Sequence, residues 1–462
     1  MRFVAVEPLV TRLTRSAIDP LQIFSWGGIG GKITSLAMPA FSSEIRHRLS
    51  SAAAGGHRKS LIIGNLRSYG YEVLCPDGNY LQTTLCDRIL HIDTQADTVT
   101  AECGVRLDVL QKRVAALGYM LPVMPGTTHL TLGGAIANDV HGKNHYRVGT
   151  FGCFVQNLEL IRASGEVLLC SRSENQEFFA GTIGGMGLTG AIAWATVQLR
   201  RVDSPLLRVE SHRFRDLTEF FDLDLRSRDL HEYSVAWIDC AAKGRALGRG
   251  VLSVADHAMS AAHPRVGATR NRRRISNVPF HMLVSPVNRV TLSAMNALYF
   301  RLHRTGIRSV HYENWLNPLD TVHSWNRLYG GRGFFQFQCV VPWSEACSSI
   351  VEMLKAVAAT RQGSFLAVLK SFGGKVSPGL MSFPMAGATL ALDFPNRGKA
   401  TRELLLELHR VTASVRGRLY PAKDACSPSD SLEVGYSNFA RFKRLLDPGL
   451  ESMMSRRLTL TG

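Results

Sequence analysis

Residues 121–152 read LPVMPGTTHLTLGGAIANDVHGKNHYRVGTFG, and this stretch decides the class of fold. The turn Pro125-Gly126-Thr127 and the pair Gly133-Gly134 leave backbone N–H groups open to a pyrophosphate or a flat ring. A polar run from Asn138 to His145 follows them. One glycine-rich turn is typical of many tight loops, but two such turns beside this polar run favour a cofactor site.

Two further glycine-rich loops flank this stretch. Residues 64–70, GNLRSYG, follow the apolar segment 60–63, and residues 184–190 read GGMGLTG. No loop presents G-x-G-x-x-G between an expected strand and an expected helix, and no Gly-Lys-Ser or Gly-Lys-Thr of a Walker A loop occurs. The sequence therefore gives little support to a Rossmann or P-loop fold.

The composition sets wider limits. A chain of 462 residues with 45% hydrophobic and 20% charged residues is globular and long enough for two or three domains, or for one large enzyme of two lobes. Lys and Arg number 54 against 37 Asp and Glu, a net charge of +17, which predicts an anionic partner: nucleic acid, a lipid surface or a phosphorylated substrate. The nine scattered cysteines form no C-x-x-C pair, so we expect reduced thiols and no metal site.

No segment is expected to be cleaved or to span a membrane. The first residues lack a sustained apolar run, and the uncharged stretch 181–199 is interrupted by glycines. We therefore expect a protein that is soluble or peripheral to a membrane.

Strands and helices alternate through the first 200 residues, which predicts an α+β fold. The expected strands are 60–63, 88–92, 98–102, 155–163, 166–169 and 191–199, and the expected helices are 41–52 and 106–117. The sequence pattern changes after residues 202–205, where longer segments with aromatic residues begin. Later strands are expected at 233–237, 334–341 and 389–394. A basic stretch at 261–279 without periodicity is expected to be a mobile loop, and residues 24–28 an anchored loop.

The three glycine-rich loops, in this order, resemble the FAD-binding domain of the vanillyl-alcohol-oxidase-type flavoenzymes. Longer strings resemble one branch, the decaprenylphosphoryl-β-D-ribose 2′-oxidases, the flavin half of a 2′-epimerase. These strings are RSYG (67–70), PGT (125–127), GGAIA (133–137), HGKNH (141–145), SFP (382–384), LDFP (392–395) and RLYPAKD (418–424). They span most of the chain, and HGKNH and LYPAKD are the specific ones.

The resemblance implies a domain organisation and a cofactor. It predicts an FAD-binding domain of the PCMH type at residues 1–203, an antiparallel-sheet substrate domain at 204–414, and a C-terminal segment at 415–462 that returns to the FAD domain. It implies non-covalent FAD, with the pyrophosphate against the first two glycine-rich loops. The residues it assigns to FAD are Gly64, Asn65, Arg67, Ser68, Tyr69, Gly126, Thr127, Thr131, Gly133, Gly134, Asn138, His141, Gly142, Ile192 and Tyr420.

The resemblance also implies a reaction. A polyprenylphosphoryl-β-D-ribose loses the proton of its 2′-hydroxyl and a hydride from C2′, and a separate NADH-dependent keto-reductase completes the epimerisation. Lys423, as base or as stabiliser of the developing alkoxide, and His141 are the catalytic candidates. The substrate-binding candidates are Tyr69, Trp237, Gln338, Lys370 and Lys423. The expected location is cytoplasmic and peripheral at the inner membrane surface, where the four arginines Arg270, Arg272, Arg273 and Arg274 would attract anionic lipid.

The chain departs from this branch at three positions. Leu66 stands where the first loop usually has a second glycine, Asn138 where the flavin-loop string has cysteine, and Ala391 where covalent inhibitors find a cysteine. The first two departures concern flavin contacts, whereas the third removes no catalytic group.

Two alternative functions remain open at this point. An aldonolactone or alditol oxidase would keep the fold and change the substrate; many such enzymes carry a flavin-tethering histidine where Arg67 precedes Ser68 here. A basic protein that only binds nucleic acid or membrane would explain the charge, but not three glycine-rich loops beside HGKNH. We therefore expect no nucleic-acid partner.

Overall fold

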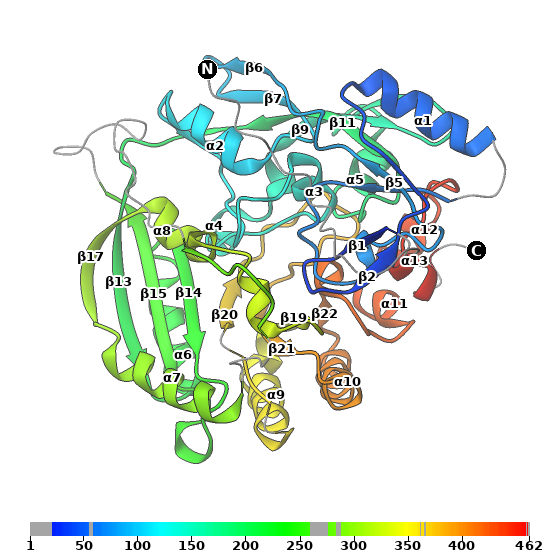
Figure 1. Ribbon diagram of the computed structural model, residues 1–462. Helices are drawn as coiled ribbons and strands as arrows, with labels where there is room; N and C mark the ends of the chain where they lie inside the picture. The colour runs from blue at the N-terminus through cyan, green and yellow to red at the C-terminus, as the bar shows by residue number, and fades with distance from the viewer. Residues whose placement is uncertain are drawn as a thin grey trace.

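The structure, a computed structural model, describes residues 21–54, 59–258, 276–282, 288–360, 362–364, 366–458 and 460. Two lobes lie one above the other in Figure 1, the first built around a five-stranded sheet and the second around an eight-stranded sheet. Helices and mostly antiparallel sheets occur in both lobes, so the predicted α+β fold class is confirmed.

The first lobe carries most of the short elements. Its strands are β1 (Gln22–Phe24), β2 (Gly30–Lys32), β3 (Ser35–Ala37), β4 (Leu61–Ile63), β5 (Asn79–Gln82), β6 (Ile89–Asp93), β7 (Thr98–Glu102), β8 (Tyr119–Met120), β9 (Val155–Ile161), β10 (Val167–Ser171), β11 (Ala191–Gln198) and β12 (Arg200–Arg201). Its helices are α1 (Ser42–Ala54), α2 (Leu107–Ala115), α3 (Leu132–Ala137), α4 (His145–Val148) and α5 (Gln176–Thr182).

Local sequence explains the elements of this lobe. The main sheet has the order β10-β9-β11-β7-β6 and is antiparallel, while β3, β5 and β4 form a small parallel sheet. The expected hairpin of β9 and β10 turns at Gly165, whose φ of +86° is open to glycine. Helix α2 buries Leu107, Leu110 and Val114 on one face, and the chain leaves the helix at Gly118, where φ is also +86°.

The second lobe is a curved antiparallel sheet with helices on it. Its strands are β13 (Leu206–Phe214), β14 (Tyr233–Ile238), β15 (Gly250–His257), β16 (Ser276–Asn277), β17 (Gly306–His311), β18 (Val322–His323), β19 (Phe334–Pro342), β20 (Ala367–Phe372), β21 (Gly387–Pro395) and β22 (Arg418–Leu419). The helices after β12 are α6 (Leu217–Ser227), α7 (Arg289–Leu302), α8 (Tyr312–Leu316), α9 (Ala346–Thr360), α10 (Lys399–Ser414), α11 (Ser431–Gly435), α12 (Phe439–Lys443) and α13 (Met453–Arg457).

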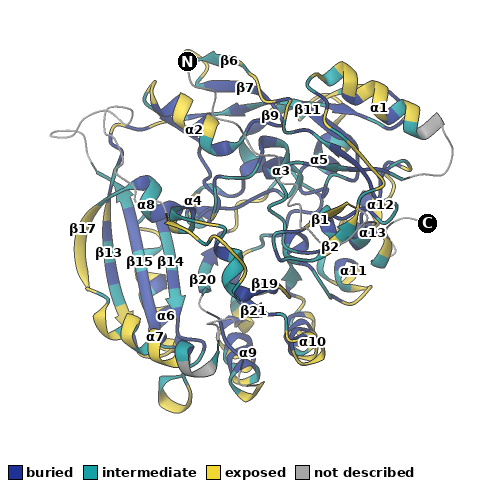
Figure 2. Ribbon diagram, in the orientation of Figure 1, coloured by how far each residue is buried: buried dark blue, intermediate teal, exposed yellow. Residues whose placement is uncertain are grey.

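The large sheet separates an apolar face from a polar one. Its order is β17-β13-β15-β14-β20-β21-β19-β22. Leu369, Leu390 and Cys339 point to the face that packs against α6, α9 and α10, and this core is fully buried (Figure 2). Because side chains alternate along a strand, Lys370 and Gln338 point to the other face, towards the first lobe.

A shared core joins the lobes. One cluster contains Val99 and Leu158 of the first sheet together with Val209, Tyr233 and Trp315 of the second lobe. Another unites Met186 with α11, α12 and α13. The C-terminal helices therefore contact the first lobe, while β22 of the same segment joins the large sheet. The division at 203/204 and 414/415 stays a prediction.

Two expectations about membranes and mobility can be compared with the structure. In the part of the chain that it describes, no helix is long and apolar enough to cross a bilayer. Arg270, Arg272, Arg273 and Arg274 lie outside the described residues. Of the expected mobile loop 261–279, residues 261–275 also lie outside the described residues; Ser276 and Asn277 form β16, which pairs in parallel with β18.

Candidate active site

The first two glycine-rich loops lie against each other. A Cβ on Gly64 would overlap the Thr131 hydroxyl, and the Asn65 amide donates to the His129 carbonyl at 2.5 Å. Leu66 holds a φ of +52°, the left-handed conformation that glycine adopts freely. The backbone shape of the loop is therefore kept where the family's second glycine is replaced.

Arg67 is a half-buried cation on the first loop. Its guanidinium lies 4.2 Å from the ring centroid of Trp26, and its Nε is buried without a hydrogen-bond partner. Burial, and next the charge of Arg106, lower its pKa to about 10. The expected anchored loop holds Trp26 there, because the Trp26 N–H donates to the Ser68 carbonyl and the Phe334 N–H to the Gly27 carbonyl. This arrangement leaves a fixed positive charge available to an anion.

A segment of the second lobe fixes the Pro125-Gly126-Thr127 turn. The Asp320 carboxylate accepts hydrogen bonds from the Thr127 hydroxyl at 2.6 Å and from the Thr128 N–H and hydroxyl, each at 2.8 Å. The Asn317 amide donates to the Pro125 carbonyl at 2.6 Å. The turn is therefore preorganised by side chains almost 200 residues away in sequence.

These loops fit FAD by their donors and by the space they leave. Besides Arg67 Nε, buried polar atoms without a partner in the structure include Asn138 Oδ1, His129 Nε2 and His141 Nδ1. A Cβ on Gly126 would meet nothing within 4 Å, and Gly133 and Gly134 are partly exposed. A cofactor with a pyrophosphate and a heteroaromatic ring system supplies acceptors and donors for such groups.

The third glycine-rich loop plays a different part. Gly184 packs against the backbone of Met381, and the Gly184 and Met186 N–H groups donate to the carbonyls of Ile136 and Ala137. Both residues are buried. This loop therefore supports the end of α3 from behind, rather than offering a bare backbone to a ligand.

The LYPAKD string meets the first loop and brings Lys423 to it. The Tyr69 N–H donates to the Ala422 carbonyl at 3.0 Å, and Gly70 lies so close to the Asp424 carbonyl that any Cβ would overlap it. Lys423 Nζ consequently lies 3.7 Å from the centroid of the Tyr69 ring. Glycine is required at position 70 because two backbones approach closely there.

Two buried carboxyl groups face Lys423. Burial lowers the pKa of Lys423 to about 7, while the charges of Asp393 and Glu72 oppose that shift. Burial raises the pKa of Asp393 to about 7 and that of Glu72 to about 7. Asp393 accepts one hydrogen bond from the Gln336 amide at 2.5 Å, and its Oδ2 has no partner in the structure. The charge of Lys423 in turn lowers the pKa of both carboxyl groups, so the three groups act on one another.

His141 lies on the opposite wall of this region. Its Nε2 is 3.1 Å from the Gln338 amide nitrogen, which can only donate, so the His141 proton belongs on Nδ1. The imidazole packs against Phe372 at 4.9 Å and Tyr420 at 5.3 Å between ring centroids. Burial, followed by the charge of Lys370, holds its pKa well below 6.5, so the ring is a neutral hydrogen-bond donor.

Three bases lie near Lys370: His141 and His145 are buried, and Lys143, like Lys370 itself, is half-buried. Burial lowers the pKa of Lys370 to about 8. Burial together with the charge of Lys370 lowers the pKa of Lys143 to about 7 and that of His145 to about 3. Both ring nitrogens of His145 lack a partner, whereas Lys143 donates to the Trp315 carbonyl beside that indole ring. Uncompensated cations at such depth are costly, which favours an anionic ligand among them.

The remaining candidate residues make contacts of different kinds. The Tyr420 hydroxyl donates to the Asn138 carbonyl at 3.0 Å, and a Cβ on Gly142 would press on Asn144 and Met124. Ile192 lies in the core of the first lobe on β11. Trp237 occupies the site-facing side of β14, but its ring packs 4.6 Å from Tyr299 of α7. The roles of all these residues stay predictions.

The site contains several acidic residues whose roles the sequence did not predict. Glu72 follows the RSYG string by two residues and Asp393 belongs to the LDFP string, whereas Asp320 is distant from every quoted string. Nothing in a single sequence marks these carboxylates as partners of a cationic site. Asp139, fully buried with a φ of +39°, accepts from Ser382 Oγ at 2.5 Å and so ties the SFP string to the flavin loop. A buried polar residue inside an otherwise small-residue turn is the one signal that could have found it.

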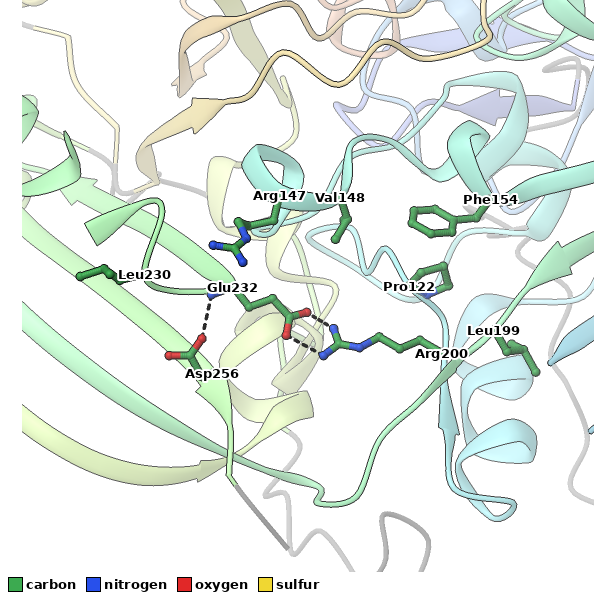
Figure 3. Close-up of a pocket in the computed structure, with 9 residues that line it drawn as sticks. All are labelled: Pro122, Arg147, Val148, Phe154, Leu199, Arg200, Leu230, Glu232 and Asp256. Atoms are coloured by element: carbon green, nitrogen blue, oxygen red, sulfur yellow. Dashed lines mark hydrogen bonds and ion pairs between the residues drawn. The ribbon is translucent and has the colours of Figure 1, made fainter. Parts of the chain in front are cut away.

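A pocket of about 590 Å³ lies elsewhere between the lobes (Figure 3). Its lining residues are Pro122, Arg147, Val148, Phe154, Leu199, Arg200, Leu230, Glu232 and Asp256. Its charged groups are already engaged: Arg200 pairs with Glu232 through two bonds, and the Glu232 N–H donates to Asp256 at 2.8 Å. It contains none of the candidate site residues, so we assign the chemistry to the Lys423 region instead. Among the described residues no group of three metal-ligating side chains occurs.

Comparison with known proteins agrees with this geometry. Residues 36–171 match the family model of an FAD binding domain. The chain is 31% identical to the decaprenylphosphoryl-β-D-ribose oxidase of Mycolicibacterium smegmatis over 452 residues, which cover 95% of this chain and 97% of that protein. It is 28% identical to the L-gulonolactone oxidase of Scyliorhinus torazame over 43% of this chain and 44% of that one, and 30% identical to an alditol oxidase of Streptomyces over 31% and 32%.

The fold and the site thus define an FAD-dependent oxidoreductase of the type that shares this FAD-binding domain. Within that class, the chain belongs to the family of decaprenylphosphoryl-β-D-ribose oxidases.

We predict that FAD is held without a covalent bond. Arg67 stands where the tethered relatives have histidine, and its guanidinium, packed on Trp26, cannot form such a link. Acid precipitation of the purified protein should release all of the yellow colour into the supernatant. Flavin that remains with the pellet would contradict this prediction.

Proposed function

We propose that this protein oxidises the 2′-hydroxyl of a polyprenylphosphoryl-β-D-ribose to the 2′-keto sugar, the first half of an epimerisation to the arabinofuranose donor. The observation that carries the proposal is the position of Lys423, a half-buried amine that lies 3.7 Å from the Tyr69 ring centroid and has a pKa of about 7 under the influence of Asp393 and Glu72. Such an amine is largely neutral at slightly alkaline pH and can take a hydroxyl proton.

Each residue of the site has its own role in the proposed reaction. Lys423 removes the proton from the 2′-hydroxyl, and Asp393 and Glu72 stabilise the ammonium that results. His141 donates from Nδ1, while Gln338 fixes its ring through Nε2. FAD, when bound, accepts the hydride from C2′. The loops around Gly64 and Gly133 hold the cofactor, and burial of the site excludes water.

The phosphate of the substrate belongs with the bases near Lys370. Lys370 is the central cation, because its charge acts on Lys143, His141 and His145. A phosphodiester or phosphate monoester there would offset the cost of partly burying two lysines, and it would accept from the one protonated ring nitrogen of the neutral His145. An unphosphorylated alditol would leave these groups uncompensated, which disfavours the alditol or aldonolactone alternative.

Anaerobic reduction of the flavin tests this proposal. Polyprenylphosphoryl-β-D-ribose should bleach the oxidised flavin spectrum in stopped-flow mixing, and the product should carry a ketone at C2′. Simple alditols and L-gulonolactone serve as the control substrates. Bleaching by these and not by the phosphoribose would support the aldonolactone or alditol alternative in its place.

The pH dependence of flavin reduction should reveal the base. The rate at saturating substrate should rise with pH through about 7, because Lys423 must lose its proton to act, and then level off. Asp393→Asn removes a negative charge that favours the protonated amine, so the rising limb should move to lower pH. The control Glu352→Gln, an exposed carboxylate outside the site, should leave the profile unchanged. A rate that falls with rising pH would instead make Lys423 a cationic stabiliser of the alkoxide.

The proposal extends to partners and location. The keto product requires a reductase to complete the epimerisation, and a separate NADH-dependent keto-reductase supplies that step from the cytoplasm. A polyprenyl chain resides in a bilayer, so the protein works at the cytoplasmic surface of the inner membrane. Nucleic acid is not a partner.

A further inference from the structure

The positive charge of this chain is concentrated in one segment. Residues 257–312, 56 in all, contain nine arginines and not one Asp or Glu, so they carry nine of the 17 excess positive charges. The structure describes the later part of this segment, which consists of α7 and β17. A run of this length without an acidic residue is unusual for a solvated surface, where charges of both signs alternate.

Helix α7 is apolar on two sides. One side packs on the large sheet: Leu292 is buried, and Asn296, also buried, donates to Asp239 at 2.9 Å. A second side, roughly a quarter turn around the helix axis from the first, carries Met295, Leu298 and Leu302, which are 53%, 56% and 68% exposed. Their spacing of three, four and seven residues puts them in one line along the helix. Figure 2 shows α7 at the lower edge of the second lobe with its outer side exposed.

Arginines flank this apolar stripe, defined here as Met295, Leu298 and Leu302. Arg301 lies on α7 beside Leu302, Arg304 follows the helix, and Arg308 lies on β17, the edge strand next to β13. All three are exposed. The surface thus combines an outward apolar line with guanidinium groups, the composition of helices that lie in the interface of an anionic bilayer.

We propose that α7 and the start of β17 form the surface by which this protein rests on an anionic lipid bilayer. The inference rests on the proposed function, because a polyprenyl substrate must be taken from a membrane. The stripe enters the boundary between head groups and acyl chains, and the arginines pair with lipid phosphates. Tyr299 lies at the edge of the stripe and packs on Trp237, whose strand β14 pairs with β20, the strand of Lys370. The docking surface therefore adjoins the substrate face of the sheet.

The chemistry of the surface favours a bilayer over other occupants. A second copy of this chain would bring two acid-free arginine surfaces together, and like charges repel. A nucleic acid would use the arginines and leave the stripe in water. Of these three occupants, an anionic membrane alone matches both the arginines and the apolar stripe.

Co-sedimentation of the full-length FAD-loaded protein with vesicles tests the proposal. One set of vesicles is phosphatidylcholine, and the other is phosphatidylcholine with an equal amount of phosphatidylglycerol. The wild type should bind the second set much more tightly, and salt should weaken that binding. Arg301→Ser/Arg304→Ser/Arg308→Ser and, separately, Met295→Ser/Leu298→Ser/Leu302→Ser should each weaken it by about tenfold or more.

A matched control removes apolar residues at a distant surface. Val109 on α2 and Leu117 just after it are 49% and 52% exposed, and Val109→Ser/Leu117→Ser should bind vesicles like the wild type. Turnover of a phosphoribose ester with a short, water-soluble chain should be unchanged in all variants. If the stripe variant loses its flavin, the arginine variant, which alters only exposed side chains, decides the question.

Two other outcomes overturn the proposal, and a third concerns only the proposed function. Wild-type binding that both triple variants retain would place the membrane contact elsewhere. A wild-type dimer that the stripe substitutions convert to a monomer, without loss of vesicle binding, would show that this surface binds a second copy of the chain. Failure of the wild type to oxidise even the short-chain ester would reject the proposed function alone, because vesicle binding is measured independently of turnover.

Discussion

Lys423→Ala should retain FAD and lose flavin reduction by about 100- to 10,000-fold, the cost of removing one well-placed proton-transfer group. The contacts of this string with the first loop are made by backbone atoms, which alanine keeps: the Ala422 carbonyl accepts from the Tyr69 N–H at 3.0 Å. Asp393, left without its cation, becomes neutral because burial already raises its pKa to about 7. The fold and the cofactor loops therefore remain intact.

The measurement is anaerobic stopped-flow reduction of the bound flavin at saturating substrate. Lys375→Ala, which removes an exposed lysine of the same lobe, is the matched control and should reduce its flavin at the wild-type rate. A small primary amine added to Lys423→Ala should restore part of the rate, whereas a purely structural lysine would show no such rescue. A variant that reduces its flavin as fast as the wild type would remove Lys423 from the mechanism.

The sequence predicted the cofactor loops because their signal is local. A glycine such as Gly64 or Gly133 indicates a close approach of another chain segment or a ligand to the backbone, because it has no Cβ. HGKNH and LYPAKD are strings long enough to be recognised. Leu66 shows the limit of that signal, because its left-handed backbone is held by the surrounding loop and not by a glycine. The same applies to the third loop, whose glycines meet protein rather than ligand.

The electrostatic partners could not be predicted from the sequence. Asp393 reaches Lys423 across 30 positions, and Asp320 reaches Thr128 across 192, through contacts that only the folded chain creates. Strand alternation alone puts Lys370 and Gln338 on the same face of the sheet, since a period of two fixes which side chains share a side. Strand alternation could not show that Lys143 lies near Lys370, because Lys143 belongs to a loop of the other lobe.

Lys370→Met should raise the KM for the phosphorylated substrate by about 10- to 150-fold, since a charge-assisted hydrogen bond contributes roughly 1.5–3 kcal/mol. At pH 7 Lys370 is mostly protonated, because burial lowers its pKa only to about 8, and a bound phosphate would hold it in that form. The rate of flavin reduction at saturating substrate should change little, because Lys423 and His141 remain in place. The effect should therefore appear as a split between KM and kcat.

Methionine suits this test because it keeps the length of the side chain and removes a buried charge. The free energy of unfolding should stay equal or rise, since a buried cation is costly without a partner. Lys355→Met, at an exposed position on α9, is the matched control and should leave both KM and stability unchanged. A β-riboside without phosphate separates binding of the phosphate from binding of the sugar: wild type and Lys370→Met should bind it equally weakly. An unchanged KM for the phosphorylated substrate would place the phosphate elsewhere, and an equal loss for both substrates would make Lys370 a contact of the sugar.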